Sequence, residues 1–182
     1  MLTQSLDDFY ESIRDVPDFP KPGIVYKDIT PLLLDHGLFS DAVSRMVGAF
    51  RDANVEKVLA IESRGFLFGA PIATALGAGL IPARKQGKLP WQRRRVEYAL
   101  EYGTDAIEIH TDAVHPGDRV LVVDDVLATG GTARAAVDIV LQAGGVVVGL
   151  AFLVELAFLS GRDKLSDHES WSLMQFPRSE AG

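Results

Sequence analysis

The sequence predicts an α/β fold with a mainly parallel, twisted sheet flanked by helices. Short apolar runs typical of buried strands alternate with helical segments, the pattern of right-handed βαβ units. The chain has 182 residues, 47% hydrophobic and 24% charged, which is enough apolar material for one domain with a buried core. It contains no Cys, which excludes disulfides, cysteine-ligated zinc, iron–sulfur clusters and thiol nucleophiles. We therefore expect residues 1–182 to form a single domain.

The first part of the chain holds two predicted helices around a proline-rich segment. Apolar residues from Leu6 to Ile13 recur at helical spacing, which predicts a helix within residues 2–14. Residues 19–31 read FPKPGIVYKDITP, and their prolines and glycine exclude regular helix. Helical periodicity returns over residues 38–53.

The remainder alternates between strands and helices. The apolar runs predict strands at residues 57–62, 79–83, 119–123 and 146–155, with further strand candidates within 98–109. Helices are predicted at residues 66–76 and 133–144, and polar loops at 84–98 and 124–132. Because ligands bind beyond the carboxyl ends of parallel strands, the loops after Glu62, Ala83 and Val123 are the candidate functional segments.

Charge and hydropathy exclude several classes of partner. With 18 Lys and Arg against 25 Asp and Glu, the net charge of −7 argues against a general nucleic-acid or anionic-membrane binder. Residues 66–83 carry no charge, but prolines and glycines interrupt them, so a helix and a strand are expected rather than a membrane span. The polar N-terminus lacks the pattern of a signal peptide. These features indicate a soluble, cytoplasmic protein without a membrane or nucleic-acid partner.

The loop after Val123 carries the most specific pattern, RVLVVDDVLATGGT over residues 119–132. Its small residues expose backbone N–H groups at the start of a helix, which is a ready anion site, and its threonines add hydroxyl donors; they are Ala128, Thr129, Gly130, Gly131 and Thr132. The preceding Asp124 and Asp125 would repel a phosphate but suit the hydroxyls of a neighbouring sugar. The spacing alone leaves open a solvated Asp pair at an ordinary glycine turn.

This segment resembles the phosphoribosyl-pyrophosphate (PRPP) motif of type I phosphoribosyltransferases. The resemblance implies that Asp124 and Asp125 bind the ribose hydroxyls and that residues 128–132 bind the 5′-phosphate. Further segments, from FPKPGIVYKDITP through IESRGFLFG and RKQGKLP to LEYG, are similar to adenine phosphoribosyltransferases in order and spacing. The family fold is a type I phosphoribosyltransferase domain, with residues of about 1–35 forming a small hood. Its reaction converts adenine and PRPP to AMP and pyrophosphate, in purine salvage.

The same resemblance implies roles for the other candidate residues. Pyrophosphate binding falls to the loop and cation residues Glu62, Ser63, Arg64, Arg84, Lys85 and Lys88, with a cis peptide bond expected at Glu62–Ser63. Glu101 and Tyr102 are the implied catalytic residues, although Glu97 and Tyr98 offer a rival register in the repeat EYALEY. Backbone groups of Val25 and Lys27 would read the edge of adenine, and Leu127 would pack on its face.

The family further implies Mg²⁺ bound mainly by PRPP, with no dedicated protein ligand, and a homodimer. Arg93, Arg94 and Arg95 match no family pattern and receive no catalytic role. A 6-oxopurine or xanthine phosphoribosyltransferase stays an alternative, although no side-chain donor for the O6 atom is evident. So does a non-catalytic PRPP-sensing module, although Arg64 and Glu101 favour an enzyme. A generic mononucleotide-binding protein leaves the Asp pair unexplained.

Overall fold

The structure, a computed structural model, describes residues 4–99 and 104–177. Its contacts divide the chain into two compact units, residues 1–45 and residues 46–182, and each is described by itself. The expected single domain over residues 1–182 stays a prediction. The cytoplasmic site of action is likewise untested, but no helix within the described residues is long and apolar enough to cross a membrane.

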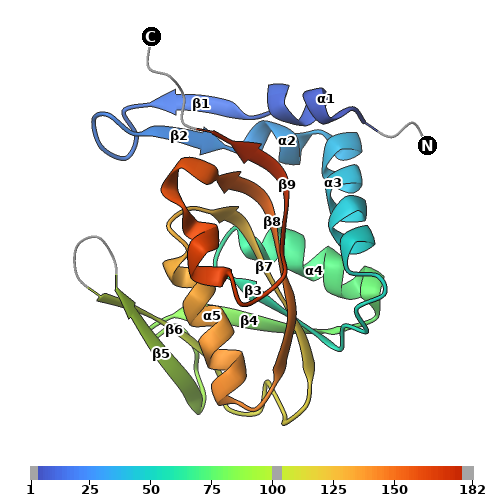
Figure 1. Ribbon diagram of the computed structural model, residues 1–182, viewed down its shortest axis with the longest axis vertical. Helices are drawn as coiled ribbons and strands as arrows, with labels where there is room; N and C mark the ends of the chain where they lie inside the picture. Colours follow the sequence, from blue (N-terminus) through green and yellow to red (C-terminus); the bar gives the residue numbers. More distant parts are fainter. Residues whose placement is uncertain (1–3, 100–103, 178–182) are drawn as a thin grey trace. The chain divides into compact units, whose positions relative to one another are not determined.

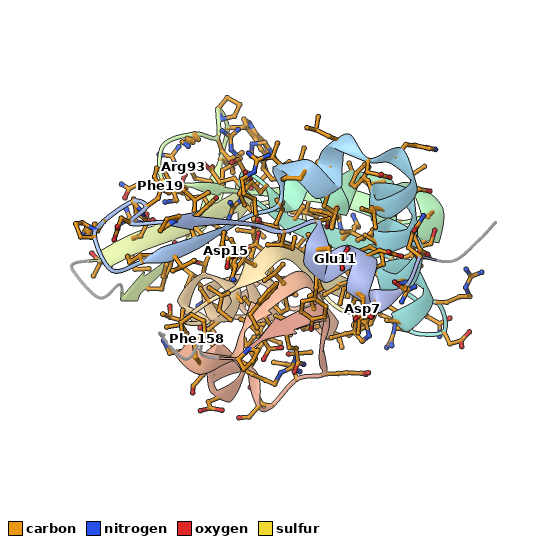
Figure 2. The ribbon with its side chains drawn as sticks, turned by 90° about the horizontal axis from the view of Figure 1, so that it is seen from above. Asp7, Glu11, Asp15, Phe19, Arg93 and Phe158 are labelled. Atoms are coloured by element: carbon orange, nitrogen blue, oxygen red, sulfur yellow. The ribbon has the colours of Figure 1, made fainter. Side chains whose placement is uncertain are left out.

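The first unit combines short helices with a two-stranded hairpin. Its elements are α1 (Leu6–Glu11), β1 (Arg14–Pro17), β2 (Val25–Asp28), α2 (Thr30–Leu34) and α3 (His36–Ala49), the last of which continues into the second unit. A capping box starts α1, because the Ser5 hydroxyl accepts from the backbone N–H of Asp8 while the Asp8 carboxylate accepts from that of Ser5. Figure 2 shows the acidic residues Asp7 and Glu11 on α1 and Asp15 on β1.

The helix predicted within residues 2–14 is shorter than expected, because strand β1 begins at Arg14. Residues 19–31 form no regular helix until Thr30, where Pro31 occupies the first turn of α2 and needs no backbone donor. The rest of the segment supplies the hairpin turn and strand β2, and Phe19 in the turn (labelled in Figure 2) meets Tyr26 on β2 edge-on, at 5.2 Å between ring centroids.

The second unit is built on a seven-stranded sheet. Its strands are β3 (Lys57–Ile61), β4 (Gly79–Lys85), β5 (Arg93–Ala99), β6 (Thr104–His110), β7 (Arg119–Leu127), β8 (Val146–Leu156) and β9 (Ser170–Phe176). The spatial order is β5-β6-β4-β3-β7-β8-β9. Neighbouring strands pair in parallel along β4, β3, β7, β8 and β9, while β6 and then β5 extend the sheet antiparallel beyond β4. The predicted fold class, a mainly parallel sheet flanked by helices, is confirmed.

Helices α4 (Gly65–Leu76) and α5 (Gly131–Gln142) lie on opposite faces of this sheet (Figure 1). Each follows a parallel strand and leads to the next one, so each belongs to a βαβ unit. Apolar side chains from both faces form the core, including Leu59, Val122 and Phe152, which are fully buried. Since parallel strands end at one edge, the loops after β3 and β7 and the start of α5 gather there.

Two expectations about local structure were wrong, and one strand was missed. Strand β7 continues through the Asp pair to Leu127, because Val126 and Leu127 still pair with β8. Residues 93–97, expected as part of a polar loop, belong to β5 (Arg93–Ala99), which pairs along its whole length with β6. Strand β9 had no prediction at all, and it is reached from β8 through two short 3₁₀ helices, η1 (Ala157–Leu159) and η2 (Gly161–Leu165).

Candidate active site

The loop between β7 and α5 forms a cavity at the edge where the parallel strands end. Its lining consists of Asp124 and residues 126–133, and it encloses about 310 Å³ including its open mouth. Gly130 caps α5 in the left-handed region, at φ +76°, where a residue with a Cβ is strained. The first residues of α5 line this cavity together with Thr129, and a helix start with two threonine hydroxyls nearby suits a phosphate group.

A second backbone segment supports this loop from η2. A Cβ added at Gly130 would lie 2.3 Å from the carbonyl oxygen of Gly161. A Cβ added at Gly161 would lie 2.1 Å from the carbonyl oxygen of Ala128. The two backbones therefore meet at a distance that only glycine permits on both sides.

Asp124 and Asp125 differ in their surroundings. The Oδ2 atom of the buried Asp125 lies 2.7 Å from the Nε atom of Arg64, in an ion pair between the end of β7 and the start of α4. Asp124 lines the cavity, and its Oδ1 atom accepts from the backbone N–H of Asp125 at 2.8 Å. Burial, followed by repulsion from Asp125, raises the pKa of Asp124. Burial also raises the pKa of Asp125, although the Arg64 guanidinium opposes this effect.

The close approach of α4 to β7 requires a glycine at the helix start. A Cβ on the buried Gly65 would lie 2.9 Å from Oδ1 of Asp124 and 3.0 Å from the carbonyl oxygen of Val123. Gly65 thus lets the Arg64 loop lie directly against the Asp pair. The predicted residues Arg64, Asp124 and Asp125 are brought together here.

The Glu62 carboxylate accepts hydrogen bonds from three of the predicted pyrophosphate-binding residues. Its carboxylate accepts from Nε of Arg84 at 2.7 Å, from the backbone N–H of Lys85 at 2.7 Å and from Nζ of Lys88 at 2.5 Å. Burial by itself would raise the pKa of Glu62, but these three hydrogen bonds outweigh it and lower the pKa. The Arg84 guanidinium also lies over the ring of Phe66, 5.8 Å from its centroid.

The peptide bond between Glu62 and Ser63 is cis, as the resemblance implied. Ser63 itself is exposed and lies in the turn that joins β3 to α4.

Lys85 takes part in a separate polar cluster near residues 128–132, which we call the phosphate loop. Its Nζ atom lies 3.1 Å from Oδ2 of Asp105, and the hydroxyl of Tyr98 donates to the same oxygen at 3.2 Å. Burial raises the pKa of Tyr98, and the nearby side chain of Thr132 at the start of α5 opposes this effect. Tyr98 therefore lies close to the phosphate loop, whereas Glu97 is exposed and pairs with Arg95.

Four of the predicted residues are not brought to this site by the described contacts. Val25 and Lys27 lie on β2 of the first unit, where Nζ of Lys27 pairs with Asp15 at 2.5 Å. Glu101 and Tyr102 lie outside the described residues. Leu127 is 1% exposed and borders the cavity at the end of β7.

Comparison with known proteins places the chain in a family. The model of the phosphoribosyl transferase domain matches residues 33–174. An adenine phosphoribosyltransferase from Anaeromyxobacter dehalogenans strain 2CP-C is 57% identical over 164 residues, which cover 90% of this chain and 95% of that protein. The chain belongs to the adenine phosphoribosyltransferase family.

Solved structures of adenine phosphoribosyltransferases have the same fold. That of the Thermoanaerobacter pseudethanolicus protein superposes with a TM-score of 0.92 at 49% identity, covering 94% of this chain and all of that one. That of the Saccharomyces cerevisiae protein, complexed with an imino-altritol bisphosphate and adenine, has a TM-score of 0.87 at 37% identity, covering 92% and 97%.

Several residues around this adenine phosphoribosyltransferase site were missed by the sequence. Glu108 is 1% exposed and fixes the connection between β4 and β5. It accepts from the backbone N–H of Gly87 at 3.0 Å and from Nε of Arg93 at 3.1 Å. Asp105 and Gly161 were missed as well. A buried Glu in the apolar strand AIEIH is a signal that could have indicated Glu108.

Proposed function

We propose that this member of the adenine phosphoribosyltransferase family transfers the 5-phosphoribosyl group of PRPP to N9 of adenine, giving AMP and pyrophosphate in purine salvage. One observation carries the proposal: Asp124 and the residues at the start of α5 line the same cavity. A sugar phosphate needs both a donor-rich phosphate site and an acceptor for its hydroxyls within a few ångströms.

At the sugar end, residues 128–132 bind the 5′-phosphate, and Asp124 and Asp125 bind the ribose 2′- and 3′-hydroxyls. The reaction is a displacement at C1′ through a transition state in which positive charge develops on the ribose ring. The paired carboxylates stabilise that charge. The charge in turn relieves the repulsion that raises the pKa of Asp124, so this interaction is stronger in the transition state than in the ground state.

At the leaving-group end, Arg64, Arg84 and Lys88 bind pyrophosphate, and Lys85 assists them. Forked guanidinium groups match phosphate oxygens in two-point hydrogen bonds. Glu62 acts on the same ligand by orienting Arg84 and Lys88, since a carboxylate itself would repel pyrophosphate. The hydrogen bonds that both cations donate to Glu62 support this division of roles.

Backbone groups of Val25 and Lys27 read the edge of adenine, and Leu127 packs on its face. Its 6-amino group requires an acceptor and its N1 atom a donor, and one extended strand supplies both. Glu101 manages the proton on N7 or N9 as N9 attacks C1′, and Tyr102 positions the reacting groups. General acid–base assistance of this kind contributes about 10²–10⁴-fold.

Mg²⁺ is proposed to bind together with PRPP. Mg²⁺ prefers oxygen ligands, and the carboxylates of Asp124 and Asp125 are of this kind, but Asp125 is already paired with Arg64. Among the described residues, no group of three or more His, Asp and Glu side chains could hold a metal by itself. Bound with PRPP, the cation supplies charge neutralisation on the leaving pyrophosphate.

We also propose a homodimer that acts in the cytoplasm. Leu67 on α4 and Leu80 on β4 are 45% and 43% exposed, which is apolar surface available to a second copy. Sedimentation equilibrium tests the dimer, and cell fractionation tests the location.

The activity is tested with purified protein, PRPP, Mg²⁺ and labelled adenine, by following AMP. AMP formation is expected. A product with hypoxanthine or guanine and none with adenine would overturn the choice of base. Tight PRPP binding with no transfer to any base would favour the sensing module instead.

Replacing Glu101 tests the proposed proton transfer. Glu101→Gln should lower kcat by about 10²-fold or more while leaving the Kd for PRPP within about twofold, because the side chain acts on the base rather than on PRPP. Steady-state kinetics and calorimetry give the two numbers. An unchanged kcat removes Glu101 from the mechanism, and the Glu97→Gln variant serves as the control for the rival register.

A further inference from the structure

An ion pair between the buried Glu155 and the partly exposed Arg162 takes no part in the mechanism described so far. Arg162 belongs to η2, the orange-red turn between β8 and β9 in Figure 1. Its guanidinium contacts Glu155 on β8 through two nitrogens: Nε lies 3.0 Å from Oε1, and Nη2 donates to Oε2. Such a two-point pair fixes the orientation of both side chains.

The same guanidinium also reaches strand β9. Nη1 of Arg162 donates to the carbonyl oxygen of Ser170 at 2.5 Å, and Nη2 donates to Oγ of Ser172 at 3.2 Å. The Ser172 hydroxyl in turn donates to Oε2 of Glu155 at 2.8 Å. Glu155 is 5% exposed, and the hydrogen bond from Arg162 lowers its pKa, so the carboxylate stays ionised and fully paired. Arg162 therefore anchors η2 to two strands at once.

The residue immediately before Arg162 is the one that supports the phosphate loop. Gly161 approaches Ala128 and Gly130 so closely that a Cβ at position 161 would lie 2.1 Å from the Ala128 carbonyl oxygen and 2.9 Å from the Gly130 nitrogen. Any shift of η2 away from β8 and β9 therefore moves the backbone that backs residues 128–130.

We propose that Arg162 is a positioning residue for the 5′-phosphate subsite: by anchoring η2 to Glu155, Ser170 and Ser172, it holds Gly161 against the loop that binds the phosphate. The inference rests on the proposed function, which assigns the 5′-phosphate to residues 128–132. Arg162 does not touch the substrate. It sets the spacing of the loop that does, and a displacement of about 1 Å at a binding group can cost up to 10²-fold in rate or affinity.

The test measures the Kd for ribose 5-phosphate and, separately, for pyrophosphate with MgCl₂, by calorimetry on the full chain. Arg162→Gln should raise the Kd for ribose 5-phosphate about tenfold and leave that for pyrophosphate within about twofold. Gly161→Ala should have at least as large an effect, because it pushes the loop directly. Arg162→Lys keeps the charge without the fork and should recover part of the affinity.

Two further variants separate positioning from folding. Arg162→Gln leaves Glu155 charged, buried and without its main partner, so the double variant with Glu155→Gln should be more stable than the single one. We expect the double variant to bind ribose 5-phosphate as weakly as the single variant. Arg119→Gln is the matched control, since Arg119 donates to the Ala53 carbonyl oxygen at 2.9 Å from the opposite end of β7. It should lower Tm without changing either Kd.

A wild-type affinity for ribose 5-phosphate in folded Arg162→Gln and Gly161→Ala proteins would overturn the inference. So would an equal loss of ribose 5-phosphate and pyrophosphate binding, which indicates general destabilisation. If Arg162→Gln does not fold, the same two Kd values, for ribose 5-phosphate and for pyrophosphate, are compared in Arg162→Lys and in the double variant. Failure of the wild-type protein to bind either ligand would instead reject the proposed function.

Discussion

Asp124 and Asp125 place two carboxylates side by side at the end of β7, where burial and mutual repulsion raise the pKa of Asp124. A raised pKa means that the folded chain holds a proton more tightly than the unfolded chain. Stability is therefore greatest below the unfolded value of 3.8 and falls as the pH rises through the raised pKa. The pair costs folding free energy at neutral pH, which is the expected signature of a binding group.

Asp124→Asn should consequently make the chain more stable and the binding weaker. At pH 7 we expect a gain of about 1 kcal/mol, or about 2–4 °C in Tm, and the gain should vanish near pH 4. The Kd for PRPP should rise about tenfold or more, since the variant loses a charged acceptor for the ribose. Thermal unfolding at both pH values and calorimetry check this. Asp125→Asn should give a smaller gain, because it also removes the ion pair with Arg64 that partly offsets the cost of burying Asp125.

Glu62 behaves in the opposite way. Its lowered pKa means that its contribution to stability is present above 4.5 and is lost as the pH falls through the lowered value. Glu62→Gln should therefore lower Tm at pH 7, and the difference from wild type should narrow below about pH 4. Glu97→Gln is the control, because Glu97 makes an exposed ion pair with Arg95 that contributes about 0–1 kcal/mol. An equal loss in both variants would contradict the role of Glu62.

At the scale of elements, helix α4 packs against the sheet through two glycines. We expect the contact at Gly69 to serve the fold alone and the contact at Gly65 to serve binding as well. Gly69→Ala places a Cβ 2.4 Å from that of Ala60, and Gly65→Ala places one 2.9 Å from Oδ1 of Asp124. Both should destabilise the fold by about 1–3 kcal/mol through overpacking. Only Gly65→Ala should also raise the KM for PRPP, by about tenfold, because it displaces the Asp pair. Equal KM values in both variants would show that the contact at Gly65 is structural alone.

Some elements could be predicted from the sequence and others could not, for physical reasons. Strands β3, β7 and β8 are buried on both faces, so their apolar runs are easy to recognise in the sequence. Helix α4 follows β3, and helix α5 follows β7. Strand β5 was missed because its arginines resemble a solvated loop, and only its pairing with β6 makes it a strand. Strand β9, SWSLMQF, mixes polar and apolar residues and depends on β8 for its partner.

The candidate site shows the same division. A contiguous pattern indicated the phosphate loop, and its residues indeed line one cavity. The support from Gly161 and Arg162 could not be predicted, because it arises from residues some thirty positions downstream that look like an ordinary turn. Likewise, nothing in a lone Glu62 indicates that its carboxylate will hold Arg84 and Lys88.

For the whole molecule, ligand binding should be measurable as stability. A ligand that binds only the folded chain adds about 2.7 kcal/mol at a concentration of 100 times its Kd. For a chain of this size, PRPP should therefore raise Tm by about 5–10 °C. Asp124→Asn, tested at the same PRPP concentration, should show a much smaller shift. A Tm that does not depend on PRPP concentration would argue against PRPP as the ligand.

The position of β5 has a consequence for aggregation. It stands at one end of the seven-strand order, where backbone groups along an outer edge can pair with a strand of another molecule. Arg93, Arg94 and Arg95 run along this strand, so an approaching second copy would bring two sets of three arginines together. Charged, bulky side chains on an edge oppose such pairing. The arginine run that matches no catalytic pattern thus protects the sheet from growing beyond its own chain.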